Sequence, residues 1–589
     1  MNVNTIKAGA FAPKIQVAAP TNNADAIISA IRKADDAGLD LLCLPELILT
    51  GCTCDDLFFQ PTLINASASA LQRIMRETAD CSVITVFGMP IMSGSSLYDC
   101  AVVIRNGEIF GVVPNTAANP RYFSNTAPEA ISIQGIGRVP VVSSIGCGII
   151  AFAVTFGAES DMNLPFPSIE CRLDSSIEIL GSANARREKL RAKKKTILYA
   201  NSGLGESTTD FVYSGHCLIF DNGELAAECK PFENTMAIAQ VSETLENSEP
   251  ASCETEYRGM KKRPFIPEAF SITQAKEIIQ ILAHGLAHRA AEINAQSFVL
   301  GVSGGLDSTL ALIVSLEAAK IMGKNAEFVH ALSMPCFGTS NRTRENTKKL
   351  CAATGVRFET IDLTESVTQH LKEIRHDISN KNVVFENAQA RMRTLVLMDI
   401  ANGEGGLVVG TGDLSESALG FCTYNGDHMS MYGVNGSIPK TLMQAIIKAI
   451  ADDSSLELRE ALCDILETPI SPELLPGDNG NIVQFTQKLI GSYELNDFFI
   501  FHALYKNLSP KSVYELALDA FADDYSPDEI KKWLKSFYKR FFASQFKRSC
   551  SPDGPQATVL SLSPRKGLFM PSEAKCAEWI REIEDSPRE

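Results

Sequence analysis

The run Ser303–Ser308, which reads SGGLDS, combines residue types that can hold phosphate. It lies between a strand-like stretch (297–302) and a helix-like stretch (309–324). Unpaired N–H groups at a helix start attract anions, and glycines let the backbone approach them closely. Asp307 adds a carboxylate, which repels phosphate unless a cation lies between them, and this indicates Mg²⁺. No Lys follows the glycines, so this is not a Walker A loop; the alternative is an ordinary glycine turn capped by serine.

A second motif opens a predicted helix at residues 386–394, ENAQARMRT. Asn387 and Arg391 stand four residues apart, as do Gln389 and Arg393, so each pair shares a helix face. Two guanidinium groups beside a nucleotide can bind phosphate or carboxylate in bidentate fashion. The alternative is a solvated helix face.

A third motif, Gly410–Glu416 (GTGDLSE), directly follows an apolar strand-like segment. Open α/β sheets bind their ligands beyond the carboxyl ends of strands, so this motif stands where a site is expected. Thr423–Asp427 (TYNGD) and Pro439–Thr441 (PKT) follow within thirty residues or so.

The elements that must position these residues alternate between strand and helix. In the first half the sequence predicts a helix over 23–35 and strands over 40–45, 82–89, 98–105, 148–156 and 196–200. In the second half it predicts strands over 328–334 and 406–411 and a helix over 387–402. Such alternation favours an α/β fold with parallel sheets. The polar stretch 242–262 is the best linker candidate, and the tail is helical and basic from Ser526 and turn-rich from Ser549.

Composition narrows the class of protein. A chain of 589 residues should form two or more domains, and 45% hydrophobic with 21% charged residues is ordinary for a globular protein. A net charge of −16 argues against a general nucleic-acid binder. The sequence shows neither a membrane span nor a signal peptide, so its 16 cysteines are expected to be cytoplasmic thiols. Cys52 and Cys54 have no second Cys/His pair at zinc spacing.

Together these motifs resemble a known family. The SGGLDS loop is similar to the pyrophosphate-binding loop of the N-type ATP pyrophosphatases, and residues 298–441 resemble the synthetase domain of NAD⁺ synthetases. Residues 334–340, 551–555 and 562–565 match further. The first half, through Pro45-Glu46 and Gly205–Asp210, resembles a nitrilase-like glutaminase domain. The resemblance implies a nitrilase-like αββα sandwich over 1–250, a linker over 251–269, and a Rossmann-like ATP pyrophosphatase domain over 270–589.

The resemblance implies an ATP-dependent amidation of deamido-NAD. The nicotinate carboxylate attacks the α-phosphorus of ATP, pyrophosphate leaves, and ammonia converts the adenylate to NAD and AMP. The matching positions assign Asp307 and Lys440 to catalysis and Asp307 and Glu416 to Mg²⁺. ATP and pyrophosphate are expected at Ser303, Gly304, Gly305, Asp307, Ser308, Arg393, Thr411 and Thr423, and deamido-NAD at Asn387, Arg391, Asp427 and Lys440.

The glutaminase half departs from its family pattern. Nitrilase-like glutaminases use a Glu, a Lys and a Cys nucleophile, and Glu46 matches the Glu. Asn115 stands in the Lys position, after Gly111–Pro114, and Gly157 stands in the Cys position. The loop 118–123, which usually carries a second Glu, has no acid. The family's glutamine hydrolysis therefore cannot run here, and the expected nitrogen source is free ammonia.

Several alternatives remain. A separate glutaminase could deliver ammonia, or the degenerate domain could only scaffold a homo-oligomer. A paralogous ligase could amidate another carboxylic acid, although the acceptor-side positions look retained. An unrecognised thiol could make the first domain competent, and a non-catalytic nucleotide-binding protein is the last option. No nucleic acid or membrane partner is expected.

Overall fold

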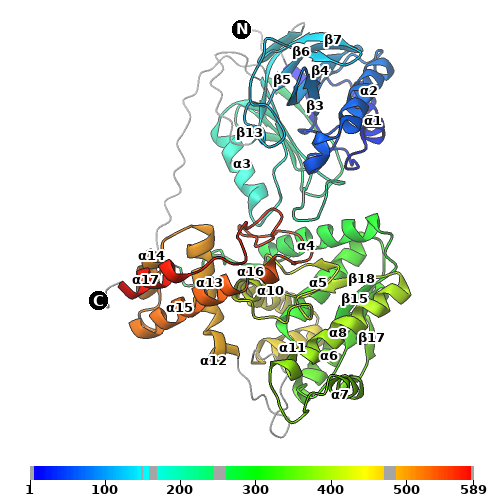
Figure 1. Cartoon of the computed structure of the whole chain (residues 1–589). Coiled ribbons are helices and arrows are strands. Elements are labelled where there is room, and N and C mark those ends of the chain that lie inside the picture. The colour runs from blue at the N-terminus through cyan, green and yellow to red at the C-terminus, as the bar shows by residue number, and fades with distance from the viewer. Residues whose placement is uncertain (1–4, 148–149, 158–168, 243–260, 470–485, 586–589) are drawn as a thin grey trace. The chain divides into compact units, whose positions relative to one another are not determined.

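The computed structural model describes residues 5–147, 150–157, 169–242, 261–469 and 486–585, shown in Figure 1. The chain forms two compact units. The first comprises Met1–Ser207 and Tyr213–Thr255, and the second comprises Thr208–Val212 and Glu256–Glu589. Most of the linker predicted over 251–269, and of the polar stretch 242–262, lies outside the described residues. Each unit is described by itself.

The first unit is built on two six-stranded sheets. One has the order β14-β1-β2-β3-β4-β5 and the other β13-β12-β11-β10-β9-β8. The first sheet contains β1 (Thr5–Ala10), β2 (Leu41–Cys43), β3 (Ile84–Ser93), β4 (Ser96–Arg105), β5 (Glu108–Pro114) and β14 (Ala237–Ser242). The second contains β8 (Ser144–Cys147), β9 (Ile150–Phe156), β10 (Ile169–Asp174), β11 (Thr196–Asn201), β12 (Cys217–Asp221) and β13 (Glu224–Cys229). The strands β6 (Ala130–Ile133) and β7 (Gly137–Pro140) pair in a separate two-stranded sheet, whose buried side chains join a core cluster of this unit.

The two sheets of this unit share one core. Inward side chains of both, among them Ile6, Val86, Val154 and Ile219, form a single buried cluster. Helices α1 (Pro20–Asp36) and α2 (Pro61–Glu77) cover the outer face of the first sheet, and α3 (Ser182–Ala192) packs Leu190 on the second. The order is therefore helix, sheet, sheet, helix, and the predicted αββα sandwich is confirmed. The strand predicted over 148–156 is β9, and residues 148–149 lie outside the described chain.

The second unit contains a five-stranded sheet of order β17-β16-β15-β18-β19 in which every neighbouring pair is parallel. Its strands are β15 (Phe298–Gly301), β16 (Val329–Ser333), β17 (Arg357–Thr360), β18 (Leu407–Gly410) and β19 (Tyr432–Gly433). Its helices are α4 (Ile272–Glu292), α5 (Leu306–Ile321), α6 (Asn341–Thr354), α7 (Thr364–Glu373), α8 (Val383–Glu404), α9 (Leu414–Leu419), α10 (Lys440–Asp452) and α11 (Leu456–Leu466). The parallel sheet predicted for this half is confirmed.

The strand order fixes where a ligand can bind in the second unit. From β15 the chain moves to β16 and β17 on one side, and it returns on the other side as β18 and β19. Because parallel strands end at the same edge, the loops after β15 and β18 lie side by side. The reversal of strand order between β15 and β18 leaves a crevice of the kind in which open α/β sheets bind ligands.

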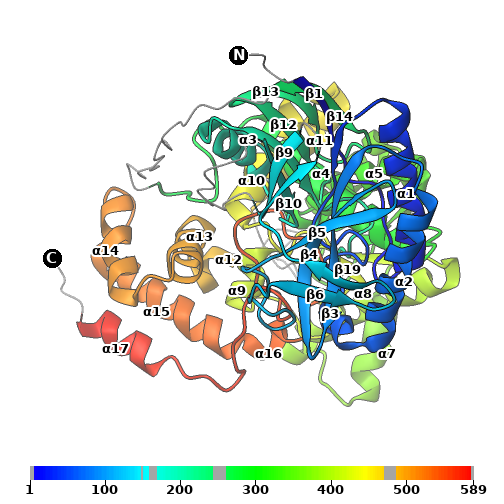
Figure 2. The same cartoon turned by 90° about the horizontal axis from the view of Figure 1, so that it is seen from above.

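A helical cluster completes the second unit. It contains α13 (Tyr493–Ile500), α14 (Pro510–Ala520), α15 (Pro527–Ala543) and α17 (Ala577–Asp585), which gather together in Figure 2 around one aromatic core. Short helices α12 (Thr486–Ile490) and α16 (Gln545–Arg548) adjoin it. The sequence predicts a helical tail from residue 526 that becomes turn-rich from residue 549. The helix α17, which lies within this turn-rich part, was not predicted. No helix among the described residues is long and apolar enough to cross a membrane, and every cysteine whose side chain the structure describes is free.

One short segment belongs to a different unit from the residues on either side of it in the sequence. Thr208–Val212, which the sequence places in the first domain, belongs to the second compact unit. The Tyr432 hydroxyl donates to the Thr208 carbonyl at 2.7 Å, and Asp210 accepts from the guanidinium of Arg565 at 2.9 Å. Asp210 is almost fully buried, so these donors replace the water that its carboxylate loses.

Candidate active site

The loop after β15 has the form predicted for an anion site. Gly304 has φ of +74°, and a Cβ there would lie 2.5 Å from the Thr343 carbonyl oxygen, so only glycine fits. Gly305 is the N-cap of α5, and the first N–H groups of that helix have no partner within the helix. The Ser308 hydroxyl accepts from the Ser303 N–H at 3.2 Å and so holds the loop closed on itself.

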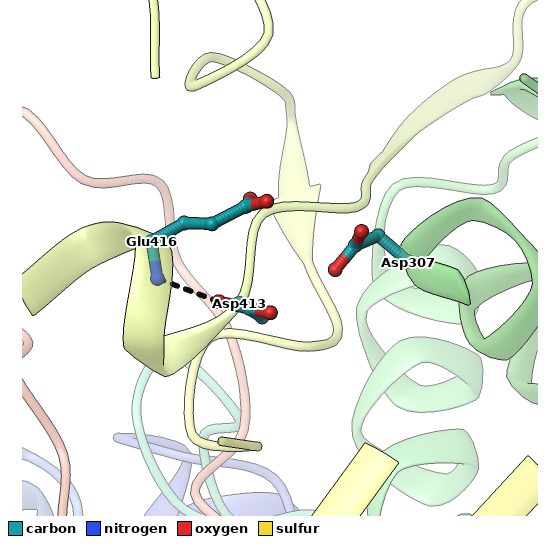
Figure 3. A group of neighbouring side chains, drawn as sticks. All are labelled: Asp307, Asp413 and Glu416. Atoms are coloured by element: carbon teal, nitrogen blue, oxygen red, sulfur yellow. Dashed lines mark hydrogen bonds between the residues drawn. The ribbon is translucent and has the colours of Figure 1, made fainter. Parts of the chain in front are cut away.

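Three carboxylates converge beside this loop, as Figure 3 shows. Asp307 comes from the first turn of α5, while Asp413 and Glu416 come from the start of α9. Their ligand atoms all lie within 4.8 Å of one another. Asp413 caps α9 by accepting from the Glu416 N–H at 2.7 Å. The buried amide of Asn435 donates to the carbonyls of Asp307 and Thr411, at 2.9 and 3.0 Å, and ties the two loops together.

A fully buried lysine supplies the positive charge among them. The Nζ atom of Lys440, the first residue of α10, lies 2.6 Å from Asp307 Oδ1, 2.7 Å from Asp413 Oδ2 and 3.1 Å from Glu416 Oε1. One ammonium against three carboxylates leaves two formal negative charges if all are ionised. Carboxylate oxygens are the ligands that Mg²⁺ prefers, and one such ion would neutralise that remainder, so the donor set fits the metal.

The excess of carboxylates over ammonium groups shifts the pKa values of the cluster. Burial raises the pKa of Asp413 well above its usual range, although Lys440 acts in the opposite sense. Burial and the neighbouring Asp307 raise the pKa of Glu416 to about 7. Burial alone would lower the pKa of Lys440, but the three carboxylates hold it well above its ordinary value. The lysine therefore stays charged, and protons or a metal must balance the carboxylates.

The structure gathers most of the predicted residues around one cavity of about 510 Å³. The cavity is lined by Ser303, Gly304, Gly305, Asp307, Ser308, Asn387, Arg393, Thr411, Glu416, Thr423 and Asp427. Asn387 accepts from the Thr423 hydroxyl at 3.0 Å, and Arg393 donates to the Met334 carbonyl at 3.1 Å.

Two of the predicted site residues, Arg391 and Lys440, do not line this cavity. Arg391 does not line the cavity; it is exposed and donates to the Tyr424 carbonyl at 3.2 Å. Lys440 lies beneath the carboxylates, so its charge is shared with them before any phosphate arrives. Asp413 was missed as a site residue, and its spacing of three residues before Glu416 at a helix start was the available signal.

The first unit holds a second, smaller polar cluster. The Asn115 amide donates to Glu46 Oε1 at 2.8 Å and to Asp99 Oδ2 at 2.9 Å, and the Ser175 hydroxyl donates to Glu46 Oε2 at 2.6 Å. Glu46, Asp99 and Asn115 are all buried. Within the described chain neither carboxylate forms an ion pair, so a neutral amide stands between two buried acids.

This arrangement must keep a proton. Burial and the Asp99 carboxylate raise the pKa of Glu46 well above its usual value, and burial raises that of Asp99 as well. Asp99 Oδ1 is buried and has no hydrogen-bond partner among the described residues. The Glu46 and Asp99 carboxyls are close enough to interact directly, so one proton shared by the pair would relieve the repulsion between them.

Gly157 follows β9 beside the end of β10. Its N–H donates to the Leu173 carbonyl at 2.8 Å, and its φ is +71°. A Cβ built there would meet no atom within 4 Å, so crowding does not exclude a side chain, but the left-handed conformation favours glycine. Residues 158–168, which follow Gly157, lie outside the described residues.

Comparison with known proteins places both halves. The NAD synthase family model matches residues 278–474, and the Carbon-nitrogen hydrolase model matches residues 7–122. The chain is 32% identical to the "Glutamine-dependent NAD(+) synthetase" of Mycobacterium leprae over 96% of this chain and 95% of that protein. The Thermotoga maritima protein of the same name is 26% identical over 87% and 90%.

Solved structures give the same fold. A glutamine-dependent NAD(+) synthetase from Cytophaga hutchinsonii superposes with a TM-score of 0.79 at 18% identity, covering 99% of this chain and 100% of that chain. One from Acinetobacter baumannii, solved with ADP, gives 0.65 at 20% identity and covers 96% and 98%.

The first prediction concerns Lys440. Replacing it by Met leaves the buried Asp413 and the half-buried Asp307 and Glu416 without their cation, so Lys440→Met should lower the free energy of unfolding by about 3–5 kcal/mol, measured by urea denaturation. Mg²⁺ should recover part of the loss. Lys448, exposed on the same helix, is the matched control, and Lys448→Met should stay within about 0.5 kcal/mol. Equal losses in the two variants would contradict a special role for the buried ammonium.

The second prediction concerns the proton on Glu46. Because the folded pKa is raised, the folded state keeps a proton that the unfolded chain releases above about pH 4.5, and stability falls as the pH rises from there. Glu46→Gln removes that penalty. Relative to the parent, its thermal midpoint should therefore rise between pH 4 and pH 8, measured by calorimetry. A constant difference across this range would show that Glu46 ionises normally.

Proposed function

We propose that this chain, which belongs to the family of glutamine-dependent NAD(+) synthetases, is an NAD⁺ synthetase that takes its nitrogen from free ammonia and not from glutamine. The family assignment rests on the match over nearly the whole length of both chains. The proposed nitrogen source is the point at which this chain would differ from these relatives, which are called glutamine-dependent.

The proposed ligase reaction has two steps. The nicotinate carboxylate of deamido-NAD attacks the α-phosphorus of ATP and pyrophosphate leaves; ammonia then attacks the adenylate carbonyl, and AMP leaves as NAD forms. The observation that supports this most directly is that a single cavity is lined both by the anion-binding loop and by two acids of the cluster, Asp307 and Glu416. Carboxylate and triphosphate repel each other, so a site for them needs donors and cations held in place before they arrive.

The residues around the cavity can each be assigned to one part of the two substrates. The N–H groups of Gly305, Leu306 and Asp307 at the start of α5 would hold pyrophosphate, with the hydroxyls of Ser303 and Ser308 beside them. Arg393, Thr411 and Thr423 would contact ATP. Asn387, Arg391 and Asp427 would contact deamido-NAD, and because Arg391 lies outside the cavity lining it has to reach the more distant part of that ligand.

Mg²⁺ would be held by Asp307, Asp413 and Glu416. When bound, the ion would offset phosphate charge and polarise the α-phosphoryl group. Lys440 would offset the repulsion among the three carboxylates and share the charge that develops on phosphate, because its ammonium is buried and stays protonated. This adds Asp413 to the ligands that the sequence predicts.

The nitrogen source is argued from the first unit. Asn115 carries no charge and is already committed to Glu46 and Asp99, so it offers no cation to an oxyanion. Gly157 has no side chain, and hydrolysis of glutamine by this family's route needs a thiolate. Cys52 is a poor substitute because burial and Glu206 raise the pKa of its thiol well above the usual value. Glu46 then serves as a structural acid.

A second candidate keeps the ligase and adds a partner. A separate glutaminase could pass ammonia to this chain, or the first unit could serve only as a scaffold for a homo-oligomer. Amidation of an acid other than deamido-NAD is the further alternative, which screening acids by pyrophosphate release would decide.

The third prediction separates glutamine from ammonia. Purified chain with ATP, Mg²⁺ and deamido-NAD should form NAD when ammonium chloride is supplied. With glutamine in ammonia-free buffer, NAD formation should not exceed the blank without a nitrogen source, because the nucleophile is missing. The measurement is NAD by enzymatic cycling. Equal rates with the two nitrogen sources would overturn the proposal.

The fourth prediction tests the acidic cluster. Asp307→Asn should lower kcat for pyrophosphate release by at least about 10²-fold, because a ligand of the cation and a partner of Lys440 are weakened together. Glu317→Gln is the matched control, since Glu317 lies on the same helix with 23% side-chain exposure against 25% for Asp307, and among the described residues its carboxylate bonds to Gln280 and Lys320. If both variants retain parental kcat, the cluster is not the reaction centre.

A further inference from the structure

The acidic cluster depends on how helices α9 and α10 are spaced. Asp413 and Glu416 stand at the start of α9, and Lys440 stands at the start of α10. Neither helix fixes the other through these charged groups alone, because carboxylates and ammonium ions accept many geometries. Hydrogen bonds outside the cluster therefore set the distance between the two helix starts, one of them from the Leu414 N–H to the Ile438 carbonyl at 3.1 Å.

Asp497, on α13, forms hydrogen bonds of this kind with both helix starts. Its Oδ1 accepts from the hydroxyl of Ser415, and its Oδ2 accepts from the N–H and the hydroxyl of Thr441, at 2.9 and 2.7 Å. Ser415 in turn accepts from the Lys440 N–H at 2.9 Å. Asp497 is fully buried, and all of these donors belong to residues that immediately neighbour Glu416 or Lys440. One carboxylate therefore bonds both helix starts at once.

A second contact brings the same face of α13 to the site. Tyr493 stands four residues before Asp497, so the two side chains share one face of the helix. The Tyr493 ring lies 5.2 Å from the Lys440 ammonium and lines the cavity. Helix α13 lies beyond residues 278–474, where the NAD synthase model matches, so the match itself does not point to either residue.

We propose that Asp497 is a positioning residue of the ligase site: it holds the starts of α9 and α10 at the spacing at which Asp413, Glu416 and Lys440 converge. It touches neither substrate nor metal and acts through Ser415 and Thr441. Groups that orient metal ligands in this way commonly change metal affinity or activity by about 10- to 100-fold when altered. This inference rests on the proposed metal site.

The test compares two neighbouring buried residues. Asp497→Asn turns one acceptor oxygen into a donor facing hydroxyl and N–H groups. Asn496→Ala removes an equally buried polar side chain on the same helix, which within the described part of the chain donates to the carbonyls of Ile490 and Ser492. For each, Mn²⁺ affinity is measured by EPR titration, kcat by pyrophosphate release with ammonium, and Tm by calorimetry, on the full chain.

Asp497→Asn should weaken Mn²⁺ binding and lower kcat, each by about 10-fold or more, whereas Asn496→Ala should lower Tm by a few degrees and leave both within about twofold. Thr441→Val, which removes one of the three donors and keeps the side-chain shape, should give an intermediate loss. In the double variant the losses should not add, because Thr441 acts through Asp497. If Asp497→Asn does not fold, Thr441→Val decides alone.

The inference is overturned if folded Asp497→Asn binds Mn²⁺ and turns over within twofold of the parent, or if Asn496→Ala changes both by the same factor. For Thr441→Val, unchanged Mn²⁺ affinity overturns it. A parent enzyme that binds no more Mn²⁺ than Asp307→Asn would instead overturn the proposed metal site, and the inference with it.

Discussion

The second unit depends on one charged contact, the buried ammonium of Lys440 among the carboxylates of Asp307, Asp413 and Glu416. Three acids brought to one point repel each other strongly once water is excluded. A lysine at the start of α10 makes this arrangement tolerable. The sheet supplies the meeting place, because the parallel strands β15 and β18 end at the same edge, and Asn435 joins the loops that follow them.

The two units handle buried acid in different ways, and this difference carries the functional argument. In the second unit a lysine balances the carboxylates incompletely and leaves room for a divalent cation. In the first unit an amide, Asn115, stands between Glu46 and Asp99, and a proton has to provide what a cation does not. A protonated Glu46 cannot act as a general base, and the neutral amide of Asn115 offers no positive charge to an oxyanion.

Much of this follows from sequence, because the signals are local. Glycines and serines in SGGLDS, followed by an apolar helix, specify an anion-binding turn, and the strand ends follow from apolar runs; Asn115 could be placed from the Val-Pro that precedes it. Asp413 could be assigned from its place three residues before Glu416 at a helix start, but Asn435 and Asp497 could not. Asp497 stands 57 residues beyond Lys440 in the printed sequence, and its role arises from burial against two helices that only the folded chain brings together.

The central claim is that the ligase site is fed by ammonia from solution. Supplying the enzyme with glutamine labelled with ¹⁵N in the amide, together with unlabelled ammonium, and weighing the NAD formed by mass spectrometry tests it within one reaction. The account predicts NAD without ¹⁵N in its carboxamide at every ratio of the two nitrogen sources. NAD that carries the glutamine label would contradict it and would show that the first unit, or a thiol within it, still hydrolyses glutamine.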